Sequence, residues 1–150
     1  MDISTVAVSG LLSLLGGFTG AFLARRTDYE KWLRQVRSQS FADFLMQAQS
    51  FQTKAIDIVH GPMPLLKRDI AVTELFMNVE TYKQIVRLYL DPQDRGRFEE
   101  LVAELRVAMN PNRDQGDRSG KFNQALKKIQ SIFEAALDSY HTKFWNRVFA

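Results

Sequence analysis

The chain has 150 residues, of which 45% are hydrophobic and 25% charged, and its formal net charge is +3. That hydrophobic content excludes an intrinsically disordered chain, and the length suits a single folded domain. Because the chain has no cysteine, disulfides, thiolate metal sites and cysteine nucleophiles are excluded. The 20 basic and 17 acidic residues are too evenly balanced to indicate nucleic-acid binding, so we expect no nucleic-acid partner.

The first segment is an uncharged run of 22 residues, from Ile3 to Ala24. As a helix it extends about 33 Å, against about 30 Å for the hydrocarbon core of a bilayer. A secretory signal peptide is one alternative, but it requires a basic start and a shorter apolar run, and here Asp2 comes first. A buried core helix is the other alternative. The run predicts a transmembrane helix over 3–24.

Small residues follow one stripe of this run, and the large apolar residues fall on a different face. Small residues let helix backbones approach closely in lipid, so the stripe predicts that the span self-associates into a homo-oligomer. In a ring of such helices, Ser9 and Ser13 could line a water-filled pore. The predicted packing residues are Gly10, Ser13, Gly16, Gly17, Gly20 and Ala24.

Basic residues follow the run directly. Residues 25–37 contain five bases and two acids, whereas 38–150 contain 15 bases and 14 acids. The positive-inside rule therefore predicts a single-pass membrane protein whose N-terminus is outside and whose remainder is cytoplasmic. Each well-placed base should attract anionic lipid headgroups with about 1 kcal/mol. The predicted headgroup collar consists of Arg25, Arg26, Lys31, Arg34 and Arg37.

The rest of the chain predicts helices. No Gly or Pro occurs between Ala21 and His60, so the membrane helix is expected to continue to the Gly61-Pro62 turn. Apolar residues recur every three or four positions along this part, which is typical of an amphipathic helix. The predicted stripe is Tyr29, Trp32, Val36, Phe44, Ala48, Phe51, Ala55 and Ile58.

Three further helices are predicted, over 69–90, from Pro92 to about Met109, and over 120–148. Asp91 is a typical N-cap for the second of these, and a polar loop follows Asn110-Pro111. Their predicted core residues are Val72, Leu75, Val79, Tyr82, Val86 and Tyr89; then Phe98, Leu101, Val102, Leu105 and Ala108; then Phe122, Leu126, Ile129, Phe133, Ala136, Tyr140, Phe144 and Val148.

No stretch alternates like a strand, so the fold class is all-α. The predicted architecture is an N-terminal transmembrane helix, 3–24, that continues into a cytoplasmic antiparallel bundle of about four helices, 25–150.

No catalytic residue, metal site or cofactor is predicted. His60 and His141 lack partners at metal-ligand spacing, and the segment from Gly116 to Lys121 lacks the spacing and the preceding strand of a phosphate-binding loop. Free amides at the start of the last helix favour anions, so a possible anion-binding site consists of Arg113, Arg118 and Lys121. An enzyme is not expected.

The stretch from Gly16 to Leu45, GGFTGAFLARRTDYEKWLRQVRSQSFADFL, resembles a group of uncharacterised small bacterial single-pass membrane proteins. These combine a Gly-rich span with an Ala-Arg-Arg step, a Trp-Leu-Arg step and an Ala-x-Phe-Leu helix start. The layout is also similar to membrane effectors of CRISPR-type phage defence. The resemblance implies an architecture and no catalytic activity.

Two functional classes follow as expectations. In the first, the chain is a membrane effector or pore whose cytoplasmic bundles assemble and rearrange the spans. In the second, it is an anchor or scaffold that holds a cytoplasmic protein partner at the membrane. A signal-ligand module for an anion or nucleotide is a further alternative.

Overall fold

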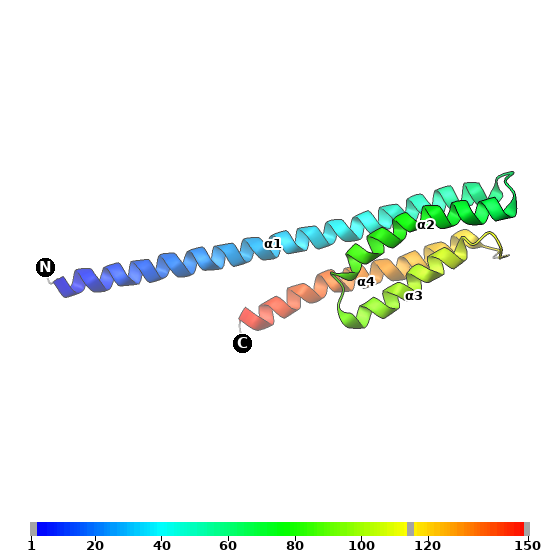
Figure 1. The fold of residues 1–150 in the computed structure, drawn as a ribbon. Helices are drawn as coiled ribbons and strands as arrows, with labels where there is room; N and C mark the ends of the chain where they lie inside the picture. The colour runs from blue at the N-terminus through cyan, green and yellow to red at the C-terminus, as the bar shows by residue number, and fades with distance from the viewer. Residues whose placement is uncertain (1–2, 114–115, 149–150) are drawn as a thin grey trace. The chain divides into compact units, whose positions relative to one another are not determined.

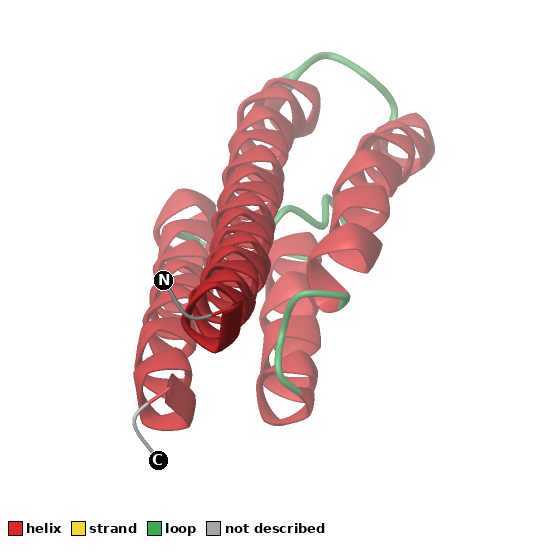
Figure 2. Cartoon of the chain, turned by 90° about the vertical axis from the view of Figure 1, so that its left-hand side faces the viewer, coloured by secondary structure: helices red, strands yellow, loops and turns green. Residues whose placement is uncertain are grey.

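The computed structural model describes the backbone of residues 3–113 and 116–148, and the side chains of 28–113 and 116–139. It contains the helices α1 (Ile3–His60), α2 (Leu65–Arg87), α3 (Pro92–Ala108) and α4 (Arg118–Val148). Short loops join them, and the described residues contain no strand (Figure 2). The chain divides into two compact units, Met1–Val36 and Arg37–Ala150, and α1 contributes to both.

The second unit is an antiparallel four-helix bundle, made by the part of α1 from Arg37 onward together with α2, α3 and α4. Successive helices in it reverse direction (Figure 1). This confirms the all-α class and the antiparallel bundle. The predicted span 3–24 lies outside the residues whose side chains are described. Among the described residues, no helix has the length and apolar character needed to cross a membrane.

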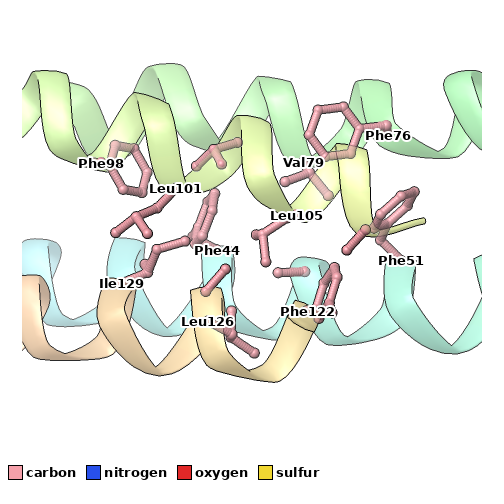
Figure 3. Packing of buried hydrophobic residues seen from close by; sticks show 14 of the residues in the cluster. Phe44, Phe51, Phe76, Val79, Phe98, Leu101, Leu105, Phe122, Leu126 and Ile129 are labelled. Atoms are coloured by element: carbon pink, nitrogen blue, oxygen red, sulfur yellow. The ribbon is translucent and has the colours of Figure 1, made fainter. Parts of the chain in front are cut away.

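Aromatic rings from all four helices hold the centre of the bundle together (Figure 3). Phe44 of α1 is fully buried, and its ring centroid lies 5.2 Å from that of Phe98 and 5.8 Å from that of Phe133. Further along α1, the ring centroid of Phe51 lies 5.1 Å from that of Phe76 in α2. Edge-to-face pairs of this kind add to the free energy gained from burial alone. The core therefore depends on a few large side chains that each contact two helices.

The sequence periodicity predicts most of this core correctly. All five residues assigned to the core of α3 are buried, and so are Phe122, Leu126, Ile129 and Phe133 of α4. On α1 the stripe is confirmed from Phe44 to Ala55. Tyr140, Phe144 and Val148 lie outside the described side chains. Buried residues that the prediction leaves out are Phe41, Val59, Phe76, Leu90, Met109, Ala125 and Ile132.

The first part of the predicted stripe is exposed. Tyr29 and Trp32 are 58% and 55% exposed, and the first buried side chain among the described residues of α1 is Phe41. A helical period of apolar residues identifies a shared face, but it does not say how far along that face other helices pack.

The helix ends differ from the prediction by a few residues. Helix α2 begins at Leu65 instead of residue 69, because Pro64 takes the position before the first turn while Leu65 and Leu66 face outward and do not contribute to the core period. Helix α4 begins at Arg118 instead of residue 120. Helix α3 starts at Pro92 after Asp91, as predicted.

Alanine substitutions at two glycines should change the free energy of unfolding in opposite directions. Gly96 lies inside α3 with nothing within 4 Å of an added Cβ, so Gly96→Ala should raise the free energy of unfolding by about 0.5–1 kcal/mol. Gly116, in the α3–α4 loop, has φ +56°, which side chains disfavour, so Gly116→Ala should lower it by about 1 kcal/mol. Urea unfolding of both variants checks the pair, and equal shifts would contradict it.

Candidate functional site

An exposed aromatic pair lies a few residues after the uncharged N-terminal run. The rings of Tyr29 and Trp32 stack with centroids 5.8 Å apart, and more than half of each residue is exposed. Helical geometry brings residues three apart onto one face, which allows the stacking. Tyr and Trp are the side chains enriched where a membrane helix meets the headgroups. The sequence prediction places both on the apolar stripe of an amphipathic helix, and periodicity alone does not show that they are exposed.

The bases of the predicted headgroup collar fall in different surroundings. Lys31 and Arg34 are exposed beside the aromatic pair. Arg37 is half-buried in the bundle, with its guanidinium carbon 6.0 Å from the centroid of the Tyr89 ring. Such a cation–π contact holds the arginine against the turn that follows α2. The side chains of Arg25 and Arg26, and those of the predicted packing stripe from Gly10 to Ala24, lie outside the described residues.

Three arginines form hydrogen bonds of one kind at the connections between helices. Each lies in the first turn of one helix and donates to backbone carbonyls at the end of the preceding helix or in the loop after it. We call these residues clasp arginines: Arg68, Arg95 and Arg118.

Arg68 of α2 makes the most complete clasp. Its Nη1 donates to the carbonyl of Val59 at 2.9 Å, its Nη2 to that of Gly61 at 2.7 Å and its Nε to that of Met63 at 2.6 Å. The last carbonyls of a helix have no partner within the helix, and they carry its negative dipole end. A guanidinium both donates hydrogen bonds to these carbonyls and brings a positive charge to the negative end of the dipole. In α3, Arg95 Nε donates to the Leu90 carbonyl at 3.0 Å.

The predicted anion site falls on the third clasp. Arg118 donates hydrogen bonds to the carbonyls of Asn110, at 2.6 Å, and Arg113, at 2.5 Å. Its guanidinium therefore stabilises the loop after α3. The first turn of α4 has its own carboxylate, because Asp117 Oδ1 accepts the amide hydrogen of Gly120 at 2.8 Å. An N-cap of this type satisfies a donor that an anion would otherwise bind. Arg118 and Asp117 therefore have structural roles at the start of α4.

The concave surfaces among the described residues include a cleft and a groove. A polar cleft of about 410 Å³ lies between the α1–α2 turn and the α3–α4 loop, with His60, Arg68, Asp117 and Arg118 in its lining. Both of its arginines donate to backbone carbonyls, which accounts for their position. An open groove of about 560 Å³ lies between α1 and α2. It is lined by Lys54, Asp57, Ile58, Ala71, Glu74, Leu75 and Asn78.

The lining of the polar cleft includes a histidine and a hydroxyl, His60 and Ser119. The groove between α1 and α2 combines apolar side chains with a lysine, an amide and two carboxylates, but no hydroxyl nucleophile next to a histidine base. In the part of the chain that the structure describes, no three His, Asp or Glu side chains come close enough to hold a metal ion. His60 is exposed, and His141 lies outside the described side chains.

Comparison with family models, with curated proteins and with solved structures finds no match for this chain.

Proposed function

We propose that this chain is a non-enzymatic, single-pass membrane protein of the bacterial inner membrane that self-associates and acts as a membrane effector. In this proposal, residues 3–24 cross the bilayer and the bundle lies in the cytoplasm. The observation that carries the proposal is the exposed Tyr29–Trp32 pair with the exposed bases Lys31 and Arg34, a few residues after the uncharged run. Aromatic and basic side chains in that order are typical of the cytoplasmic end of a membrane helix.

The effector role rests on the small residues of the span. Bundles that assemble would bring several spans together, and the stripe from Gly10 to Ala24 would then form the contact between them. Membrane effectors of phage defence, which the layout resembles, are one class that would behave in this way. Lipid headgroups and further copies of the chain are the expected partners.

A scaffold is the second candidate function. It is favoured by large apolar side chains that α2 leaves exposed on the bundle, among them Leu66 and Leu88 at 73% and 74%. A scaffold needs a surface for a partner protein and no pore. In the effector, contacts between the spans are part of the function, whereas in the scaffold the span only anchors the bundle.

Membrane topology can be tested with single cysteines, because the chain has none of its own. A membrane-impermeant maleimide should label Asp2→Cys in spheroplasts, and it should label Gln130→Cys only after the membrane is opened. Labelling of both in intact spheroplasts, or release of the protein by alkaline washing, would overturn the membrane proposal.

Leucine at two small positions of the span should separate effector from scaffold. Gly17→Leu combined with Gly20→Leu should reduce dye release from vesicles that contain the purified protein by at least tenfold, because bulky side chains hold the helices apart. Leu15→Ile, on the face of large residues, is the matched control and should leave release unchanged. If the double variant inserts normally and still releases dye, the pore-like effector is wrong.

A further inference from the structure

Helix α2 carries a second apolar face on the side opposite the core. At 100° per residue, four large side chains fall in one narrow stripe along the helix and its C-cap residue Leu88, whose backbone is still helical. Leu66 is 73% exposed, Ile70 51%, Met77 60% and Leu88 74%. The buried residues of α2 lie on the reverse side of the helix. A helix with two apolar faces is expected where a second partner covers the outer one.

The stripe is symmetric along its length. Its residues are separated by four, three, four, four, three and four positions, so that it reads the same in both directions: Leu66, Ile70, Thr73, Met77, Thr81, Gln84 and Leu88. An antiparallel copy on a two-fold axis through Met77 would therefore bring Leu66 against Leu88 of the second copy. Thr73 would likewise meet Thr81. Self-complementarity of this kind is what a two-fold interface requires.

The charges beside the stripe favour the antiparallel direction. Asp69 and Arg87 lie on the same flank, and antiparallel packing places Asp69 of each copy near Arg87 of the other. Arg87 already pairs with Glu99 of its own chain through Nε at 2.7 Å, but a guanidinium has further donors. Parallel packing would instead place Asp69 near Glu74 of the second copy, which is a like-charge contact.

The exposed area is sufficient for a pair. From the exposed fractions, the stripe and the neighbouring Ile85 present on the order of 600 Å² on one copy, so two copies would cover roughly 1,200 Å², the lower end of specific interfaces. We propose that the outer face of α2 is a self-association surface, on which a second copy of this chain packs antiparallel about a two-fold axis at Met77. The proposal concerns the unit Arg37–Ala150 and does not rest on the proposed membrane function.

Disulfide cross-linking of the full chain in detergent micelles tests both the surface and the direction. Detergent micelles keep the full chain in solution and let the bundles of two copies meet. Met77→Cys should cross-link to itself. A mixture of Leu66→Cys and Leu88→Cys chains should form mixed dimers, whereas neither variant alone should cross-link, because a disulfide needs Cα atoms within about 7 Å.

Each other outcome overturns a defined part of the proposal. Self-cross-linking of Leu66→Cys would show parallel packing and overturn the two-fold axis at Met77. Absence of every cross-link would overturn self-association through α2. A polarity-sensitive dye on Met77→Cys that reports apolar surroundings only after phosphatidylglycerol vesicles are added would identify a lipid-binding face instead.

A charge substitution gives an independent measure. Met77→Glu places two carboxylates at the two-fold axis and should weaken the dimer at least tenfold in analytical ultracentrifugation. Met46→Glu is the matched control, since Met46 is 56% exposed on α1 and outside the stripe, and it should leave the dimer unchanged. Equal dimerisation of both variants would contradict the proposal. Unchanged circular dichroism would confirm that both variants fold.

Discussion

Phe44→Ala is expected to lower the free energy of unfolding of the bundle by about 3–5 kcal/mol. The Phe44 side chain is fully buried and packs against Phe98 of α3 and Phe133 of α4. Its removal takes away the transfer free energy of a phenyl ring and leaves a cavity that three helix backbones cannot close. It also removes two edge-to-face aromatic contacts.

Urea unfolding of the full chain in mild detergent, followed by far-ultraviolet circular dichroism, measures this loss. Met46→Ala is the matched control, because Met46 lies two residues away on α1 and is 56% exposed. It should change the free energy of unfolding by no more than about 0.5 kcal/mol. A Phe44→Ala variant as stable as this control would show that α1 does not pack on α3 and α4 as described.

Arg68→Ala is expected to lower the free energy of unfolding by about 2 kcal/mol, which is large for a residue that is only half-buried. The substitution removes three charge-assisted hydrogen bonds at once, to the carbonyls of Val59, Gly61 and Met63. Water can reach part of this turn and replace some of them, so the loss is smaller than the sum of three buried bonds.

Two comparisons make this result specific to the guanidinium. Lys67→Ala removes an exposed neighbouring charge and should have almost no effect. Arg68→Lys keeps the charge at the end of α1 but offers no planar fork, so its stability should lie between those of the wild type and Arg68→Ala. The same urea titration measures all three variants. If Arg68→Lys matched the wild type, charge alone would account for the clasp.

The bundle core could be predicted from the sequence because burial and helical period coincide there. Phe98, Leu101 and Leu105 recur at the spacing of one helix face, and all are buried. The turns are also marked locally, by Gly61-Pro62 and by Asp91-Pro92.

The outer face of α2 could not be separated from its core face by the same reasoning. Leu66, Ile70 and Met77 follow the helical period as well as Val72 and Val79 do, and only the packing of the other helices decides which set is buried. For the same physical reason, the apolar stripe that includes Tyr29 and Trp32 does not reveal that both are exposed.

The clasp arginines have no sequence signature of their own. Arg68, Arg95 and Arg118 look like ordinary charged residues in the first turn of a helix, where the helix dipole disfavours them. Their role depends on the end of the preceding helix, which the chain brings near only after it has reversed direction. The sequence alone therefore places Arg118 in an anion site and gives no sign of its hydrogen bonds to the carbonyls of Asn110 and Arg113.

The clasps also bear on the order in which the bundle assembles. Their hydrogen bonds join residues between five and ten positions apart, so the loops that they close are short. Closing a short loop costs little chain entropy, and topologies rich in local contacts fold quickly. Each helical hairpin can therefore form as soon as its second helix begins. On the ribosome, the α1–α2 pair would be held by Arg68 before the residues of α4 have been synthesised.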